Sequence, residues 1–409
     1  MTAEKNNAGV LVIIGFAEAL SAPEVVWSLA DHGSKVVAFT RKGNHSALRS
    51  SRYVALIEIT APETSCVQAI ADLTEQVSRL KAAHPQWQLA LMPLDDGSLC
   101  LLSLTPRIHD IPIIGPTEQG AVWALDKSAQ IECAREAGFA VPQTAVVDKA
   151  SDVFAMPVEF PLVFKPVWAT REQNGRLARG RAWTCADRLE LEAGVKSWRE
   201  CEPMLLQKYI AGVGEGLFGL ADGGSVIAWS AHRRLRMMNP QGSGSSACIS
   251  QEVDAGLKAA GERLIALTRW HGLFMIELLR DESGKAWFME FNGRTWGSMA
   301  LARRMGFEYP AWAVQKTLYP ASTVALPPLR HPLVCRHLGR ELVHLLFVMR
   351  GSKSRASTGW PSRWRTARQV LSYSRNDRWY NWRADDRKVF FNDSIGTIKG
   401  QIFRSKGQG

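Results

Sequence analysis

Residues 272–295 read GLFMIELLRDESGKAWFMEFNGRT, and this stretch predicts a β-hairpin. Strand-forming residues flank Ser283 and Gly284, a pair that suits a two-residue hairpin turn. If these two residues form the loop, stepping outward along the two strands places Glu277 directly opposite Glu290. Like charges in opposed positions destabilise a sheet, so this pair calls for an explanation.

A third oxygen-bearing side chain belongs to the same face of this hairpin. Side chains alternate along a strand, which puts Asn292 on the face of Glu290. Magnesium takes one or two carboxylates and fills its other positions with water and substrate phosphates. We therefore predict a metal site at Glu277, Glu290 and Asn292. The alternative is a pair of solvated glutamates on an exposed hairpin face.

Lys165 is a second candidate for binding an anion, because it ends the apolar stretch FPLVFKPV at residues 160–167. Burying an ammonium is costly unless an anion compensates, and a nucleotide phosphate would do so. A lysine at a strand end is more often a surface residue whose apolar stem alone is buried. Taken alone, Lys165 is therefore a weak signal.

The N-terminal part of the chain alternates between strand and helix patterns. A β-rich run at 10–14, helical spacing at 23–32 and a second β-rich run at 35–40 predict a parallel sheet. The loop that begins at Gly15 lacks the glycine pattern of dinucleotide-binding domains, which excludes an NAD or FAD site there. We place a domain boundary near Thr117.

Two acidic residues, Asp95 and Asp96, follow another strand candidate at 89–94. A loop at the carboxyl end of a parallel strand can face a ligand. A turn with solvated acids is an equally good interpretation.

The rest of the chain changes pattern. Residues 121–137 predict a helix, and residues from 160 to about 292 predict short strands with turn signals and one helix at 255–270. This is typical of an α+β domain built on antiparallel hairpins. An apolar helix is expected at 333–349.

The composition is that of a globular protein with two or three domains. The 409-residue chain is 46% hydrophobic and 22% charged, and no apolar run reaches the roughly 18 residues of a membrane span. Seven scattered cysteines without a Cys-x-x-Cys pair argue against a disulfide framework or a zinc site. We therefore expect a cytoplasmic protein without an integral membrane segment.

The net charge of +11 is concentrated at the C-terminal end. Residues 326–409 contain 17 Lys and Arg against 5 Asp and Glu, and tryptophans alternate with arginines there. Such a segment can bind nucleic acid or a membrane surface, or attract an acidic substrate or carrier protein. We favour a basic helical cap that packs its tryptophans on the rest of the protein, and we do not expect nucleic acid as a partner.

Four segments, in order along the chain, resemble the ATP-grasp superfamily over about the first 320 residues. Residues 114–145 resemble the first nucleotide segment of that family, with Lys127 at the position of an ATP-contacting lysine. Residues 160–167 resemble the second segment, which puts Lys165 on the α-phosphate side. The hairpin resembles the last segment, which supplies the metal ligands.

Residues 202–217, the third segment, resemble the linker strand whose backbone meets the adenine base. The resemblance implies that Glu215 binds the ribose hydroxyls and that Arg294 contacts a phosphate or carboxylate during catalysis. The adenine edge is implied for four residues, Gln207, Lys208, Tyr209 and Ile210.

Residues 231–248 resemble the substrate-facing strand and loop of amide-forming members, the branch that includes D-aspartate ligase-like and polysaccharide-associated enzymes. Cationic side chains beside a Gly/Ser loop would hold a carboxylate or acyl phosphate. Alternation puts His232 and Arg234 on one face, so we favour this pair over Arg233 as catalytic residues. The loop after Lys165 departs from the family, because it is rich in arginine where many members have a glycine-rich lid.

The resemblance also implies an architecture. It consists of a Rossmann-like parallel-sheet domain at 1–117, an ATP-grasp domain at 118–325 and a basic C-terminal extension at 326–409. The two lobes of the ATP-grasp domain are expected at about 118–203 and 204–325.

The activity implied by the resemblance is a carboxylate–amine ligase that uses ATP and Mg²⁺. A small-molecule carboxylate and an amine would be joined through an acyl phosphate, with release of ADP and phosphate. ATP-dependent phosphorylation or carbamoyl-type chemistry on the same scaffold is an alternative. A homodimer is the default expectation for the oligomeric state.

Overall fold

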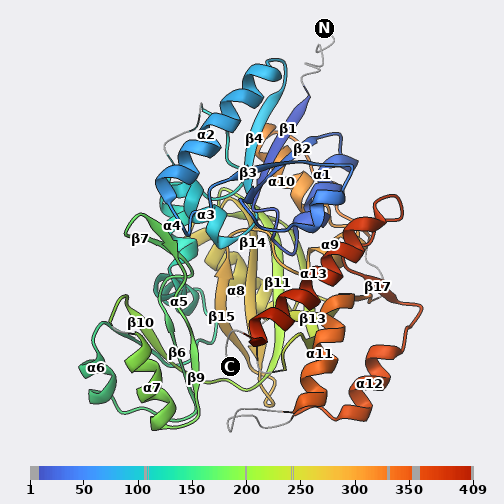
Figure 1. Ribbon diagram of the computed structural model, residues 1–409. Coiled ribbons are helices and arrows are strands. Elements are labelled where there is room, and N and C mark those ends of the chain that lie inside the picture. The colour runs from blue at the N-terminus through green and yellow to red at the C-terminus, as the bar shows by residue number, and fades with distance from the viewer. Residues whose placement is uncertain are drawn as a thin grey trace.

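The computed structural model describes residues 9–105, 108, 110–198, 200–240, 242, 244–328, 332–351 and 360–406. Over these residues the chain forms a four-stranded parallel sheet, a four-stranded antiparallel sheet, a seven-stranded mixed sheet and a two-stranded hairpin. Figure 1 shows the parallel sheet at the top, a small lobe at the lower left and the C-terminal helices at the lower right. None of the described helices is long and apolar enough to cross a membrane.

The N-terminal region is a four-stranded parallel sheet in the order β3-β2-β1-β4, as the sequence predicts. The central strands β1 and β4 are almost entirely apolar because helices cover both faces of the sheet. Val12 and Ile14 belong to the cluster that includes α1, and Leu11 and Ile13 to the cluster that includes α2. The elements are β1 (Val10–Gly15), α1 (Ala22–Asp31), β2 (Lys35–Arg41), η1 (Ala47–Ser50), β3 (Ala55–Ile59), α2 (Cys66–Ala83), β4 (Gln88–Pro93) and α3 (Asp96–Leu104).

The small lobe is a four-stranded sheet in the order β5-β10-β6-β9, with antiparallel pairing throughout. Phe164, Trp183 and Trp198 pack together on one of its faces. The elements of this lobe are β5 (Thr144–Val147), α6 (Ala150–Ala155), β6 (Leu162–Pro166), β9 (Trp183–Cys185), α7 (Arg188–Trp198) and β10 (Met204–Lys208).

A seven-stranded sheet in the order β15-β14-β11-β12-β13-β16-β17 forms the body of the molecule. The helix α8 packs on one face with Leu217 and Leu278, and Phe218 and Met275 point to the opposite face. Its elements up to α10 are β11 (Val213–Asp222), β12 (Ser225–Met237), β13 (Ser245–Gln251), α8 (Ala255–Leu267), β14 (Gly272–Arg280), β15 (Ala286–Asn292), α9 (Met299–Arg304) and α10 (Tyr309–Leu318).

The C-terminal segment is built into this sheet and is not a separate cap. Two three-residue strands extend the sheet, and α11 packs against both α12 and α13. The predicted helix at 333–349 therefore begins later, after a strand. The elements are β16 (Val334–Arg336), α11 (Leu338–Arg350), α12 (Arg363–Leu371), β17 (Asp377–Trp379) and α13 (Arg387–Lys406).

The tryptophans of this segment differ in their surroundings. Trp379 stacks on Tyr373 and lies 5.3 Å from the Arg336 guanidinium, whereas Trp364 is 88% exposed. The packing interpretation therefore holds for Trp379, and a binding role for the exposed face of α12 stays a hypothesis.

Two predicted boundaries differ from the structure. The helix expected at 121–137 is two helices, α4 (Glu118–Leu125) and α5 (Lys127–Glu136), because the Asp126 side chain caps the second one. The strand β10 pairs with β6, so the small lobe continues to Lys208 and does not end at 203. The linker between the two lobes is therefore at 209–212.

The arginine-rich loop after Lys165 is a hairpin docked on the N-terminal region. Its strands are β7 (Arg171–Gln173) and β8 (Arg176–Ala178). The Cys66 amide donates to the Gly175 carbonyl at 2.7 Å, and the Leu177 amide donates to the Pro62 carbonyl at 2.8 Å. The loop is therefore ordered by backbone contacts within the protein.

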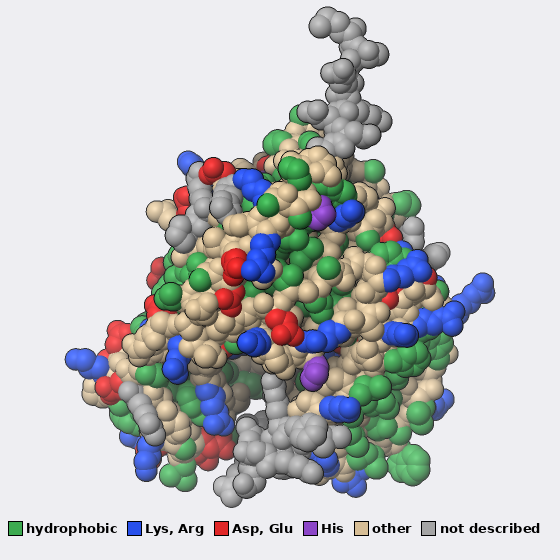
Figure 2. Space-filling view, turned by 45° about the horizontal axis from the view of Figure 1, so that its top comes forward, with side chains coloured by type: hydrophobic (Ala, Val, Ile, Leu, Met, Phe, Trp, Pro, Cys, Tyr) green, Lys and Arg blue, Asp and Glu red, His purple; other side chains and the backbone are tan. Residues whose placement is uncertain are grey.

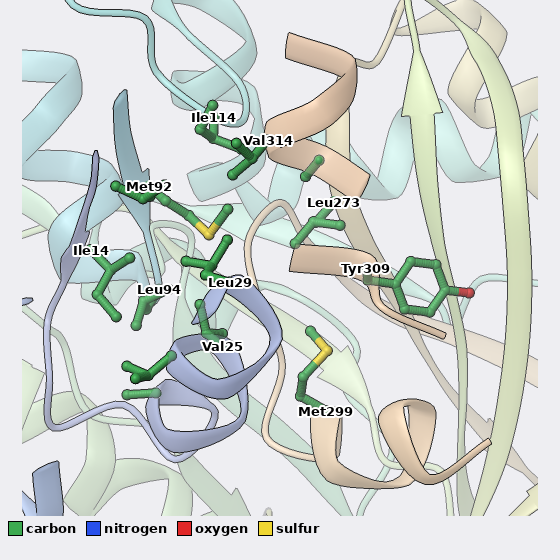
Figure 3. Close-up of a cluster of buried hydrophobic side chains, with 14 of the residues drawn as sticks. Ile14, Val25, Leu29, Met92, Leu94, Ile114, Leu273, Met299, Tyr309 and Val314 are labelled. Atoms are coloured by element: carbon green, nitrogen blue, oxygen red, sulfur yellow. The ribbon is translucent and has the colours of Figure 1, made fainter. Parts of the chain in front are cut away.

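The N-terminal region and the body share one hydrophobic core. Figure 3 shows Val25 and Leu29 of α1 and Met92 of β4 on one side of this cluster, with Leu273 and Val314 on the other. Each Å² of apolar surface removed from water stabilises the folded state by about 25 cal/mol. A core shared by the two parts therefore fixes their relative position. The loops that follow β1 and β4 are thus held against the body of the protein.

Candidate active site

Glu277 lies directly opposite Glu290, as predicted, although the hairpin differs in detail. The loop is longer than two residues, because the Asp281 amide closes it onto the Lys285 carbonyl. Arg280 is therefore opposite Ala286, one residue out of the predicted register. A β-bulge at Met289 restores the register, so both carboxylates still face each other.

Asn292 belongs to the same face as the two glutamates. It is buried, lies opposite Met275, and its amide nitrogen donates to Glu290 Oε1 at 3.3 Å. With the nitrogen turned to a carboxylate, the amide oxygen is available as a ligand. The sequence-based grouping of Glu277, Glu290 and Asn292 is thus present in the structure.

Arg234 reaches Glu277 from the neighbouring strand β12. Its Nη2 lies 2.8 Å from Glu277 Oε1. Gly214, between the two on β11, leaves room for this contact, since a Cβ there would lie 2.5 Å from Arg234 Cδ. Arg234 therefore compensates part of the repulsion between the opposed glutamates and holds the Glu277 side chain.

Lys165, on β6 of the small lobe, lies near this acidic pair. Burial lowers the pKa of Lys165 to about 8, and the nearby Lys127 ammonium acts in the same direction. Glu290 and Glu277 act in the opposite direction, which places their charges near Lys165. Among the described residues, no carboxylate lies within 4 Å of the Lys165 nitrogen to form an ion pair. The charges of Lys127, Glu277 and Glu290 thus all lie near the Lys165 ammonium.

The face drawn in Figure 2 is hollowed between the lobe at the lower left and the rest of the molecule. Lys and Arg side chains lie beside Asp and Glu side chains above this hollow. Side chains of both positive and negative charge suit a ligand that combines phosphates with a divalent cation.

The predicted adenine edge lies at the end of β10, and its first residue carries an unsatisfied polar atom. Gln207 is buried and donates to Thr144 Oγ1 at 2.9 Å, whereas its Oε1 has no hydrogen-bond partner among the described residues. An acceptor left open in this way fits a ligand amino group. Lys208 instead forms a surface ion pair with Glu159, and Tyr209 and Ile210 follow as the linker.

Arg294 is held by an acid of the N-terminal region. Its Nε and Nη2 donate to the two carboxylate oxygens of Asp96 at 2.9 and 3.3 Å. Burial raises the pKa of Asp96, but the Arg294 guanidinium outweighs it and the net pKa lies below the ordinary value. The sequence leaves open whether Asp96 faces a ligand or is a solvated acid in a turn. It does not reveal the contact with Arg294, because Arg294 is far away along the chain.

His232 is buried without an acidic partner among the described residues, which argues against the cationic role predicted for it. It is 3% exposed, packs edge-on against Phe218 with ring centroids 4.7 Å apart, and has no partner for either ring nitrogen among the described residues. Burial lowers its pKa to about 3, and Arg234 adds to this effect. It does share the face of Arg234 and Glu277, as alternation predicts.

Glu215 lies on the wrong face for the ribose role predicted for it. It alternates along β11 with Gly216, the residue opposite Glu277. Both of its carboxylate oxygens accept hydrogen bonds from Arg280 Nε at 3.0 Å, on the face that α8 covers. Glu215 therefore fixes Arg280 and does not line the space that contains Lys165.

The residues present fit a magnesium–nucleotide complex. Among the described residues, no group of three or more His, Cys, Asp or Glu side chains could hold a metal ion. A cation between Glu277 and Glu290 would depend on these two carboxylates, the Asn292 amide, water and phosphate, which is the ligand set that magnesium accepts. The open acceptor of Gln207 and the ammonium groups of Lys127 and Lys165 are groups that would suit the base and the phosphates of a nucleotide.

No protein-family model and no curated protein matches the sequence. The structure is similar to N5-carboxyaminoimidazole synthetase from Staphylococcus aureus, with a TM-score of 0.58, 16% identity, and coverage of 82% of this chain and 83% of that one. It is also similar to L-amino acid ligase from Bacillus licheniformis, with a TM-score of 0.54, 17% identity, and coverage of 77% and 75%.

A third similar structure is the biotin carboxylase domain of 2-oxoglutarate carboxylase from Hydrogenobacter thermophilus, in complex with MgADP, ADP and bicarbonate. The TM-score is 0.59 at 15% identity, and the match covers 79% of this chain and 73% of that one. At such identities the similarity establishes the fold alone. The chain has the ATP-grasp fold, as the resemblance implied.

Proposed function

We propose that this protein is an ATP-dependent carboxylate–amine ligase that forms an amide through an acyl phosphate. The observation that carries the proposal is the opposed pair Glu277 and Glu290, with Asn292 beside them and the Lys165 ammonium near enough for their charges to act on it. The similarity to L-amino acid ligase and to structures with bound ADP or MgADP supports this choice.

The nucleotide would lie between the lobes. Lys127 and Lys165 would neutralise its phosphates, and the strand end from Gln207 to Ile210 would meet the adenine. When bound at Glu277, Glu290 and Asn292, magnesium would supply further positive charge at the phosphate oxygens.

The reaction then needs positioning and charge stabilisation, and no protein nucleophile. The substrate carboxylate attacks the γ-phosphorus, a new P–O bond forms, and the bond to ADP breaks. The neutral amine next attacks the acyl carbon, phosphate leaves with the electron pair of the broken C–O bond, and the nitrogen gives up one proton to the departing phosphate or to water. Arg294, held in place by Asp96, is our candidate for binding the transferring group, and Arg234 positions Glu277.

A screen of ADP release tests this function directly. We expect ADP release that requires both a carboxylate and an amine, with an amide as the product by mass spectrometry. A stable phosphorylated acceptor in place of an amide would indicate kinase chemistry and would overturn the ligase assignment.

Nucleotide binding should take up protons at alkaline pH. With a pKa of about 8, Lys165 is largely neutral at pH 9, and a nearby phosphate favours its charged form. Titration with a non-hydrolysable ATP analogue at pH 9, in buffers of different ionisation enthalpy, should show uptake of up to about one proton, and little uptake at pH 7. Lys165→Arg keeps the charge and should remove the uptake. Equal uptake in this variant would assign the proton to another group.

A further inference from the structure

The helix α12 exposes two large apolar side chains on one of its faces. Trp364 and Leu371 are 88% and 79% exposed, whereas Thr366 is buried. Because 3.6 residues make one turn, positions seven apart lie on the same face of a helix, and position 368 lies between them. Trp364 and Leu371 therefore point outward together, with the exposed Arg368 beside them. An exposed apolar group with a polar rim marks an interaction site.

The neighbouring helix α11 exposes a second apolar row. Leu342, Leu346 and Met349 have the i, i+4, i+7 spacing of one helix face, and they are 37%, 42% and 52% exposed. The two rows belong to adjacent helices, because α11 packs against α12. In Figure 2, hydrophobic side chains gather at the lower right, where Figure 1 places the C-terminal helices, and Lys and Arg side chains lie beside them.

The same stretch of chain carries positive charge without acids. Residues 342–376 contain no Asp or Glu and seven Lys and Arg, namely Arg350, Lys353, Arg355, Arg363, Arg365, Arg368 and Arg375. The acids on either side of this stretch, Glu341 and Asp377, are both paired with the buried Arg336. Among the described residues, no carboxylate oxygen lies within 4 Å of the guanidinium groups of α12. The charge of the exposed arginines is therefore left for a partner.

The combination of apolar and cationic side chains discriminates between partners. A second copy of the chain would meet the same surface in a symmetric dimer, so uncompensated cations would face cations. Nucleic acid would contact the arginines and stack on the indole, but it gives exposed leucines no apolar surface to enter. An anionic bilayer offers phosphates to the arginines and an apolar layer to the leucines. Tryptophan suits the boundary between the two, because its ring is apolar and its N–H is polar.

We propose that the exposed faces of α11 and α12 bind the surface of an anionic lipid bilayer. The apolar side chains enter the boundary between headgroups and acyl chains, and the arginines contact lipid phosphates. This inference is independent of the proposed function, since the binding needs neither a nucleotide nor a substrate. The lipid-binding surface consists of Leu342, Leu346, Met349, Trp364, Arg368 and Leu371.

Co-sedimentation of the full-length protein with lipid vesicles tests the inference. We expect binding to vesicles of phosphatidylcholine mixed with phosphatidylglycerol, much weaker binding to phosphatidylcholine alone, and a loss of affinity as salt is raised. Leu371→Gln should weaken the binding at least about 10-fold, because one leucine no longer leaves water. Arg368→Gln should weaken it about 5-fold, the effect of one cation near an anionic surface.

Two substitutions elsewhere on the surface serve as matched controls. Leu189→Gln removes a leucine of α7 that is 74% exposed, and Arg135→Gln removes an exposed arginine of α5. Both variants should bind the mixed vesicles like the wild type. Because all four replaced side chains are exposed, none of the substitutions should lower the melting temperature.

Three results would overturn the inference. The first is the absence of binding to the mixed vesicles, and the second is equal binding by wild type and Leu371→Gln. The third is a wild-type dimer that Leu371→Gln dissociates, or DNA or RNA that binds more tightly than the vesicles, since another partner would then cover this surface. Failure of the ligase proposal would be seen only in the ADP-release assay and would leave vesicle binding intact.

Discussion

Glu290→Ala should lower carboxylate- and amine-dependent ADP release by at least about 100-fold, a loss typical of removing a group that stabilises charge in the transition state. Without Glu290, the hairpin keeps one carboxylate, Glu277, and that carboxylate is already paired with Arg234 at 2.8 Å. Asn292 would also lose the carboxylate to which its amide donates. The cation that we place here would therefore lose its best ligand.

The same substitution should not destabilise the protein. Glu277 and Glu290 are like charges in directly opposed positions, so removing one of them relieves repulsion. We expect an unchanged or slightly higher melting temperature, and added Mg²⁺ together with an ATP analogue should raise it less than in the wild type. Glu282→Ala, in the exposed loop of the same hairpin, is the matched control. Undiminished turnover in Glu290→Ala would remove the metal assignment.

The opposition of these glutamates was predictable because the alternation of a strand is local information. The prediction of a two-residue loop is wrong, however. The Asp281 side chain accepts from the amides of Ser283 and Lys285 and closes a longer turn. That error alone would have moved Glu290 out of register. The bulge at Met289 compensates for it, and a bulge has no clear signature in a sequence without glycine at that position.

Other site features depend on contacts that no local pattern contains. Arg294 and Asp96 are 198 positions apart, so the sequence indicates that each is polar but not that they meet. Glu215 was assigned from a motif, whereas its orientation depends on the register of β11 against β14. The burial of His232 by other elements, which lowers its pKa, cannot be read from the residue type.

The C-terminal segment shows the same limit for the fold. β16 and β17 are three residues long, too short for an alternating pattern to stand out. They form strands because β13 offers an edge on which β16 can pair. The charge and the tryptophan content of this segment therefore predict a cap. The pairing of β16 with β13 and of β17 with β16 instead makes the segment part of the central sheet.

The buried carboxylate of Glu24 connects the C-terminal segment to the N-terminal region and to the body of the molecule. It is 1% exposed on α1 and accepts from Arg303 Nη1 at 2.8 Å and Arg304 Nη2 at 3.0 Å, both on α9. It also accepts from the backbone amide of Asn381 at 3.1 Å. Two of the three donors belong to α9, and the third lies in the turn that follows β17, so the carboxylate joins α1 to both.

Glu24→Gln should therefore lower the free energy of unfolding by about 3 kcal/mol, within the range for removing one partner of a buried ion pair. The amide keeps the shape of the carboxylate but leaves Arg304 without an acid, and one of its hydrogens points at a donor. Asp31→Asn is the control for partly exposed ion pairs, because Asp31 contacts the same Arg303 at 3.1 Å and also Arg383 at 2.8 Å, from a side chain that is 38% exposed. An exposed pair of this kind contributes about 1 kcal/mol or less. Urea unfolding measures both variants. Equal, small losses would mean that Glu24 does not hold α1, α9 and the C-terminal segment together, whereas a large loss in a single transition would show that the three unfold as one unit.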